Sequence, residues 1–276
     1  MTAAASEIKA CCAAAYSSPV VAWLLGPRLH PGGRELTERL IRSLGALPGG
    51  VVVDVACGRG ESTLQVARAT GAQAIGIDLS AVSIAAARRS AEVAGLAASV
   101  EFVVGDAEAL PLGDGAADAV LCECSFCTFP DKERAAAELA RVLKPGGRLA
   151  LSDMVADRER LPASLRTLEA WVACLADARP LGSLVELLAG AGLDPLVVER
   201  HDDALVRLLE RVDGRLRLAR VAFDADGHLV ERGLDLVAAA RESIERGILG
   251  YAVVVARRTA DGAAATMART GASNLV

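Results

Sequence analysis

From residue 51 onward, short apolar runs alternate with longer amphipathic segments. Runs rich in Val, Ile and Leu predict strands, and the run at 51–55 predicts an inner strand that is buried on both faces. The longer segments carry apolar residues three and four positions apart, which predicts helices. Because the two kinds of segment take turns, the chain is predicted to be an α/β protein with a doubly wound, mostly parallel sheet. The predicted strands are 51–55, 73–77, 100–104, 119–122, 148–152, 196–200 and 251–256, and the predicted helices between them are 61–69, 81–94, 132–143, 162–178 and 181–191.

The two ends of the chain do not follow this alternation. Residues 1–48 hold two helical patterns joined by turns rich in Pro and Gly, and they are predicted to form a helical lid. Residues 49–258 are predicted to be one domain, with a helical insertion at 202–246 before the last strand. Residues 259–276 are rich in Ala, Gly, Thr and Ser and are predicted to be a disordered tail.

The turn after the first predicted strand carries the strongest chemical signal. There Gly58 and Gly60 stand directly before a helical pattern, and glycines at such a turn let a ligand approach the backbone closely. The second predicted strand ends at Asp78, about 20 residues on, where an acidic residue typically binds ribose hydroxyls. Thr63 stands where the dinucleotide motif has its third glycine, and no Gly-Lys-Ser/Thr follows. The pattern therefore does not favour binding of a pyrophosphate.

Four segments, taken in order, give the chain a family resemblance. Asp54–Gly60, Gly76–Ser80, Gly105–Pro111 and Ala140–Leu149 together resemble the class I S-adenosylmethionine-dependent methyltransferases. The resemblance implies a Rossmann-like, seven-stranded sheet with an antiparallel last strand, and S-adenosylmethionine as the cofactor. It also implies that the cofactor contacts Asp54, Ala56, Cys57, Gly58, Gly60, Asp78, Leu79, Asp106, Ala107 and Glu123.

The segment after the fourth predicted strand indicates a class of methyl acceptor. Its Cys124 and Cys127, the Pro-Asp-Lys at 130–132 and the later Cys174 resemble the arsenite methyltransferases, where the cysteine matched by Cys174 binds trivalent arsenic. Soft thiolates suit soft, thiophilic centres. We therefore expect Cys174, Cys124 and Cys127 to contact a small soft nucleophile, namely trivalent arsenic, selenide, sulfide or a small thiol.

Two other functions stay open from the sequence. The chain is alternatively a methyltransferase for the oxygen, nitrogen or carbon of a natural product or quinone, in which the thiols only pack. It is otherwise a non-catalytic module that binds S-adenosylmethionine. His30 lies in a Leu-His-Pro-Gly-Gly turn, where a surface position is predicted and the role of a lid base is the alternative.

Composition narrows the possible partners. A net charge of −5 and the lack of a long Lys/Arg run argue against a nucleic-acid partner. The first 15 residues do not resemble a signal peptide and no 18-residue apolar run occurs, so we expect a cytoplasmic protein without a membrane partner. The seven cysteines are then predicted to be reduced thiols, and their spacing does not predict a metal site. Few aromatic residues favour a small-molecule substrate, while the oligomeric state is left open.

Overall fold

The computed structural model of the chain describes residues 3–26, 28–45, 47–167, 177–222 and 226–259. Its centre is a seven-stranded sheet with the strand order β3-β2-β1-β4-β5-β7-β6. Strands β1 to β5 run parallel, and β7 is antiparallel to both of its neighbours. The predicted doubly wound α/β fold, with an antiparallel last strand, is therefore confirmed. The strands are β1 Val51–Val55, β2 Gln73–Asp78, β3 Val100–Val104, β4 Ala117–Glu123, β5 Leu143–Ala156, β6 Leu193–Arg200 and β7 Leu249–Arg258.

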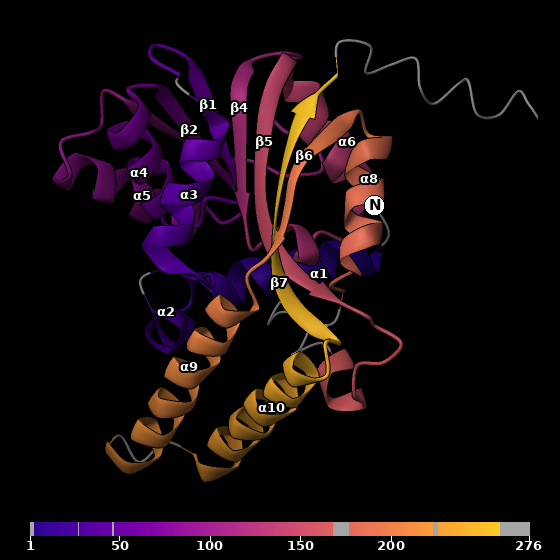
Figure 1. Ribbon diagram of the computed structural model, residues 1–276. Coiled ribbons are helices and arrows are strands. Elements are labelled where there is room, and N and C mark those ends of the chain that lie inside the picture. Colours follow the sequence, from indigo (N-terminus) through magenta and orange to yellow (C-terminus); the bar gives the residue numbers. More distant parts are fainter. Residues whose placement is uncertain (1–2, 27, 46, 168–176, 223–225, 260–276) are drawn as a thin grey trace, which may run out of the picture.

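Helices cover both faces of the sheet, as Figure 1 shows. On one face, α3 (Gly33–Leu44) and α4 (Glu61–Thr70) share a buried cluster with Val52 and Leu121, while α5 (Ala81–Val93) packs on β3. On the other face, α6 (Lys132–Val142) and α8 (Leu181–Gly190) share a cluster with Val53 and Val120. Successive residues of β1 and β4 thus belong to opposite cores, which is why these strands are mostly apolar.

The N-terminal segment divides into two parts. Helices α1 (Ala3–Ser17) and α2 (Pro19–Leu25) precede α3, and α1 lies along the edge at which the parallel strands end (Figure 1). In contrast, α3 buries Leu36, Leu40, Ile41 and Leu44 in the core beneath the sheet. The segment predicted as a lid thus contains one helix that is an integral part of the core.

Helix α2 was not predicted, because the Ser-Ser-Pro sequence resembles a turn. The side chain of Ser18 accepts a hydrogen bond from the backbone N–H of Val20, and Pro19 occupies the first helical turn. This is a helix start, since the fixed φ of proline suits the first turn and its missing N–H is not needed there. In the predicted helix 162–178, the described part contains a short 3₁₀ helix at Ala163–Arg166, and 168–176 lie outside the described residues.

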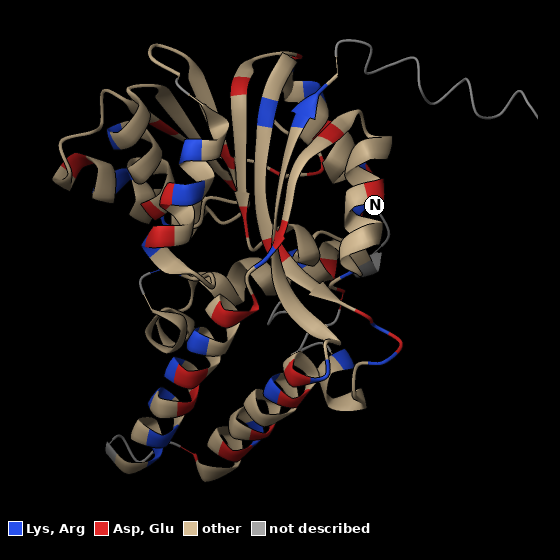
Figure 2. Cartoon of the chain, in the orientation of Figure 1, with Lys and Arg blue, Asp and Glu red and all other residues tan. Residues whose placement is uncertain are grey.

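The predicted insertion before the last strand forms two long helices. Helices α9 (Asp202–Ala222) and α10 (Gly227–Glu245) lie side by side and project beyond the sheet (Figure 1). They bury Leu208, Val212 and Val237 between them, and Leu24 and Leu25 of α2 pack against this cluster. Figure 2 shows charges of both signs along the two helices. Residues 260–276 of the predicted tail lie outside the described residues.

Candidate cofactor and acceptor site

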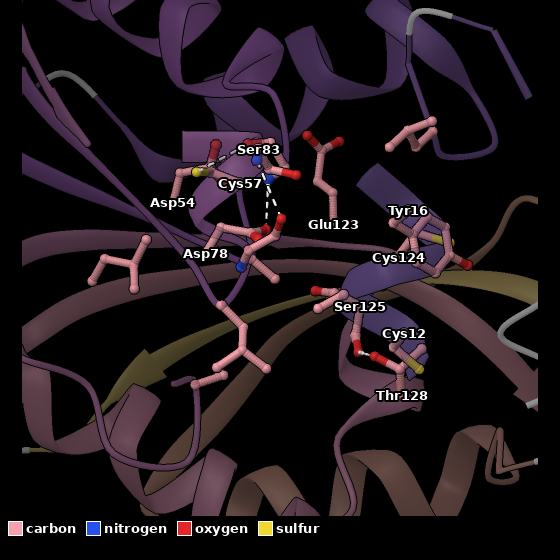
Figure 3. A pocket seen from close by; sticks show the side chains of 18 of the residues that line it. Cys12, Tyr16, Asp54, Cys57, Asp78, Ser83, Glu123, Cys124, Ser125 and Thr128 are labelled. Atoms are coloured by element: carbon pink, nitrogen blue, oxygen red, sulfur yellow. Dashed lines mark hydrogen bonds between the residues drawn. The ribbon is translucent and has the colours of Figure 1, made fainter. Parts of the chain in front are cut away.

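A cavity of about 170 Å³ lies where the parallel strands β1, β2 and β4 end. Its walls come from the turn after β1, the end of β2, the loop after β3, the segment after β4, helix α1 and the loop between α2 and α3. In parallel α/β sheets, ligands bind outside the carboxyl ends of the strands. Figure 3 shows Asp54 and Asp78 on one side of this cavity, and Tyr16, Cys12 and Cys124 on the other.

The glycine turn is held against the neighbouring strand by one carboxylate. The Oδ2 of Asp78 accepts the backbone N–H of Gly58 at 2.8 Å, and its Oδ1 accepts that of Ser80 at 2.8 Å. Gly58 lines the cavity with a φ of 54°, and a Cβ there would meet nothing within 4 Å. The backbone at Gly58 is therefore open to the cavity, as the missing side chain allows.

Gly60 has a different role from the one expected. It does not belong to the cavity wall, and a Cβ at this position would lie 2.6 Å from the Phe102 ring and 3.0 Å from Ala87. Its missing side chain therefore allows α4 to start close to β3 and α5. The glycine serves helix packing, with a positive φ of 81° that also favours glycine.

Two buried carboxyls give the cavity floor its electrostatic character. Asp54 is 3% exposed, and Thr63 donates a hydrogen bond to its Oδ2 at 2.6 Å. Burial, with smaller contributions from the charges of Glu123 and Asp78, raises the pKa of Asp54 to about 8. Burial also raises the pKa of Asp78, against the opposing effect of its two backbone hydrogen bonds. Such a floor is suited to a cationic ligand, because a positive charge favours the ionised carboxylates.

Of the predicted acceptor cysteines that the structure describes, Cys124 lines the cavity and Cys127 does not. Cys124 and Cys57 belong to its wall, but burial raises the pKa of the Cys57 thiol well above the usual value, which keeps that thiol protonated. Cys127 is 4% exposed, packs in the core cluster and is not part of the cavity wall. Cys174 lies outside the described residues. Sequence analysis did not select Cys12 of α1, which also lines the cavity.

At the other end of the cavity, Leu79, Asp106 and Ala107 line the wall. Lys9 of α1 donates hydrogen bonds to Asp106 Oδ2 at 2.7 Å and to Glu108 Oε2 at 2.5 Å. This contact joins the N-terminal helix to the loop after β3 across 97 residues of sequence. Sequence analysis missed Lys9, because a lone lysine in an alanine-rich helix resembles a solvated residue.

His30 is buried, contrary to the surface position that was predicted. It is 8% exposed and lines the cavity together with Arg28 of the same loop. Its Nδ1 lies 3.0 Å from the carbonyl oxygen of Pro31, and its Nε2 lies 3.9 Å from Glu123 Oε2. The prediction was wrong because the residues of the turn do not reveal that the loop between α2 and α3 lies against the end of β4.

Within the described ranges, no group of three or more His, Cys, Asp or Glu side chains is arranged to hold a metal ion. In the same part of the chain, no single helix has the length and hydropathy of a membrane span. The segments Ala5–Ser17 and Pro19–Leu25 meet that test only together and are bent by 68°.

Fold, glycine turn and the acid at the end of β2 together define a class I S-adenosylmethionine-dependent methyltransferase, and the chain belongs to that family. Residues 53–151 match the family model described as "Methyltransferase domain". The open approach at Gly58 and the carboxylate of Asp78 fit the backbone contact and the ribose diol that S-adenosylmethionine requires.

Known proteins similar to the chain include two curated relatives and one solved structure. Methyltransferase GfsG of Streptomyces halstedii is 38% identical over 127 residues, which is 46% of each chain, so the match spans about half of that relative's length. O-methyltransferase resE of Aspergillus sclerotiorum is 30% identical over 80% of this chain and 82% of its own. The crystal structure of the [4+2]-cyclase SpnF is 27% identical, with a TM-score of 0.75, and the match covers 92% of this chain and 97% of that chain.

Proposed function

We propose that the chain transfers the methyl group of S-adenosylmethionine to a hydroxyl oxygen of a small molecule. The observation that carries this proposal is the buried imidazole of His30 in the cavity wall. A hydroxyl is a hard nucleophile that needs a general base, whereas a thiolate or arsenite does not. The similarity to the O-methyltransferase resE, over four fifths of both chains, also supports an oxygen acceptor.

Within this function we propose roles for the residues of the cavity wall. Asp78 binds the ribose hydroxyls, and Leu79 packs on the adenine, whose amino group is capped by Asp106 and Ala107. The methionine part lies along Asp54, Ala56, Cys57, Gly58 and Glu123. The proposal is supported by the fact that all these residues line one cavity, which they reach from four separate segments of the chain.

We further propose that α1, α2 and the loop that carries His30 act as the lid over residues 49–258. The ion pairs of Lys9 with Asp106 and Glu108 support this role, because they hold α1 over the proposed adenine end of the cavity. An enclosed cavity excludes water, which would otherwise solvate the nucleophile and compete with it.

A soft nucleophile, including trivalent arsenic as in the arsenite methyltransferases, is the second candidate acceptor. It is favoured by Cys12 and Cys124, which line the cavity wall opposite Asp54 and Asp78 (Figure 3). It is opposed by the position of Cys127, which is buried away from the cavity. A third candidate, a cyclisation without methyl transfer, is favoured by the likeness to the cyclase SpnF over nearly the whole chain.

One acceptor panel tests the two methyltransferase candidates against each other. The purified chain is incubated with S-adenosylmethionine and with phenols, alcohols, hydroxyquinones, small thiols, selenide or arsenite, and S-adenosylhomocysteine formation is measured. We expect turnover with hydroxyl acceptors. Turnover confined to thiols, selenide or arsenite would support the soft-nucleophile candidate, and a complete lack of turnover would contradict both methyltransferase candidates.

Cysteine variants sharpen the distinction between the two kinds of acceptor. We expect Cys12→Ser and Cys124→Ser to retain turnover of the hydroxyl acceptor within about threefold, because neither thiol takes part in the chemistry. Cys11→Ser is the matched control, since Cys11 neighbours Cys12 but does not belong to the cavity wall. A loss of turnover in Cys124→Ser but not in Cys11→Ser would argue for a thiol that contacts the acceptor.

A further inference from the structure

The loop between α2 and α3 carries His30, and the hydrogen bond of its imidazole ring defines the tautomer. Nδ1 of His30 lies 3.0 Å from the carbonyl oxygen of Pro31, the next residue. A carbonyl oxygen only accepts hydrogen bonds, so the proton of the neutral ring lies on Nδ1. The Nε2 atom then carries a lone pair and is free to accept a proton.

This Nε2 atom is buried and has no hydrogen-bond partner among the described residues. The side chain is 9% exposed and belongs to the cavity wall. Buried polar atoms are nearly always hydrogen-bonded in folded proteins, so an unpaired one in a ligand cavity indicates a partner that the ligand supplies. For a nitrogen with a free lone pair, that partner is a hydrogen-bond donor, such as a hydroxyl group.

The carboxyl group of Glu123, in β4, lies beside this nitrogen. Its Oε2 is 3.9 Å from His30 Nε2, too far for a hydrogen bond but close enough for a strong electrostatic interaction. The carboxylate is held by Ser62 Oγ at 2.5 Å and by Thr37 Oγ1 at 3.0 Å, and it is 4% exposed. The carboxyl group is therefore held beside the imidazole ring without occupying the Nε2 lone pair.

We propose that His30 is the general base of the methyl transfer and that its Nε2 atom takes the proton of the acceptor hydroxyl. This proposal rests on the proposed function, because only an acceptor with an ionisable proton needs such a base. As the acceptor oxygen bonds to the methyl carbon, the bond between that carbon and sulfur breaks and its electron pair stays on sulfur. The hydroxyl proton moves to Nε2 and is later released to solvent, so that atoms and charge balance.

The position of the base on the lid has a consequence for catalysis. His30 and Arg28 reach the cavity from the loop before α3, whereas Glu123 belongs to the central sheet. The base and its carboxylate are therefore assembled only when the loop is seated on the sheet. Proton removal is thereby coupled to exclusion of water from the cavity.

The test compares His30→Ala and His30→Asn with the unmodified chain, using a hydroxyl acceptor found in the panel. Asparagine keeps a side-chain N–H that can donate to the carbonyl oxygen of Pro31, but it lacks a basic nitrogen. We expect kcat to fall by about 10²-fold or more in both variants, as is typical for loss of a general base. The dissociation constant of S-adenosylhomocysteine, measured by calorimetry, should stay within about threefold of the unmodified value.

Two readouts separate a base from a structural residue. Added imidazole should restore part of the activity of His30→Ala, and the loss in both variants should shrink as the acceptor hydroxyl becomes more acidic. His228→Ala is the matched control, because His228 lies at the start of α10 and does not belong to the cavity wall. It should keep full activity.

The outcomes distinguish failure of the base from failure of the proposed function. If the unmodified chain turns over no hydroxyl acceptor, both the proposed function and this inference are wrong. If the unmodified chain is active and His30→Ala keeps its kcat, only the inference is overturned. The inference is also overturned if His30→Asn restores the activity lost in His30→Ala, since the hydrogen bond to Pro31 would then be what matters.

Discussion

At the scale of single residues, Asp54 links the cavity floor to the stability of the chain. Its pKa rises from 3.8 to about 8 on folding, mainly because the carboxyl is buried. The folded state therefore binds the proton more tightly than the unfolded state does. Between these two pKa values the unfolded state holds fewer protons, so the contribution of Asp54 to stability decreases as the pH rises.

We expect Asp54→Asn to remove this pH dependence. Between about pH 5 and pH 7, the free energy of unfolding of the unmodified chain should fall by about 1.4 kcal/mol per pH unit relative to the variant. Urea unfolding at several pH values measures both slopes. Asp118→Asn is the control, because hydrogen bonds from Lys144 and from the backbone of Val51 lower the pKa of Asp118. Asp118 therefore titrates below this pH window, and Asp118→Asn should keep the slope of the unmodified chain. Equal slopes in Asp54→Asn and the unmodified chain would contradict the prediction.

Ala56 is a residue with a side chain at a backbone position that favours glycine. Its φ is 58°, in the left-handed region, where a Cβ crowds the following carbonyl oxygen. We expect Ala56→Gly to raise the free energy of unfolding by about 0.5 to 1 kcal/mol. The substitution relieves the backbone strain of the folded state, and the greater entropy of the unfolded glycine chain offsets part of that gain. Denaturant unfolding measures the change.

A glycine in a regular helix should have the opposite effect. Ala85 is exposed in the middle of α5, so Ala85→Gly should lower the free energy of unfolding by about 1 kcal/mol. If both substitutions destabilise the chain equally, the strain assigned to Ala56 is not real.

At the scale of elements, the N-terminal helix α2 depends on the helix pair α9 and α10. The Nη1 of Arg215 in α9 donates hydrogen bonds to the carbonyl oxygens of Trp23 at 2.6 Å and Leu24 at 3.0 Å. These carbonyls lie in the last turn of α2, where no further helical N–H is available to them. The helix pair thus supports α2 through a contact between residues 192 positions apart in sequence.

We expect Arg215→Ala to loosen α2 without unfolding the sheet. Amide hydrogen exchange in residues 19–25 should become faster by about 5- to 10-fold, which corresponds to the loss of roughly 1 kcal/mol of hydrogen bonding. Arg217→Ala is the matched control, because Arg217 pairs with Asp213 of its own helix. Equal exchange rates in the two variants would show that Arg215 does not stabilise α2.

At the scale of the whole molecule, the strand order brings segments distant in sequence to one cavity. The turn after β1, the end of β2 and the segment after β4 meet because these strands are neighbours in the sheet. A ligand that contacts all three segments binds the folded chain and not the unfolded one. Binding therefore stabilises the fold.

We expect S-adenosylmethionine and S-adenosylhomocysteine to raise the melting temperature of the chain, whereas NAD and ATP should not. At a ligand concentration 100 times the dissociation constant, the stabilisation is about 2.7 kcal/mol, enough for a rise of several degrees. A thermal unfolding series in each ligand measures it. Asp78→Asn should reduce the rise, because the variant loses the carboxylate that holds the Gly58 turn and that is proposed to bind the ribose. A rise in NAD or ATP alone would contradict the assignment of the cofactor.

Much of the fold and of the proposed cofactor site could be predicted from the sequence. The strands β1 and β3 were predicted residue for residue, because each is a short run of mostly β-branched and aromatic residues. Nine of the ten residues predicted to contact the cofactor line the cavity, and Gly60 does not. These positions follow from strand ends and from the turn between them, which are local features that the order of residues encodes.

Only the tertiary structure decided what stands opposite the cofactor residues. Sequence placed Cys127 at the acceptor and His30 on the surface, whereas the folded chain buries Cys127 in the core and puts His30 beside Glu123. Lys9 and Arg215 make their contacts over 97 and 192 residues. The periodicity of a segment determines which of its faces is buried, but not which distant segment covers that face. That depends on how the helices before and after the sheet pack against it, a property of the whole chain.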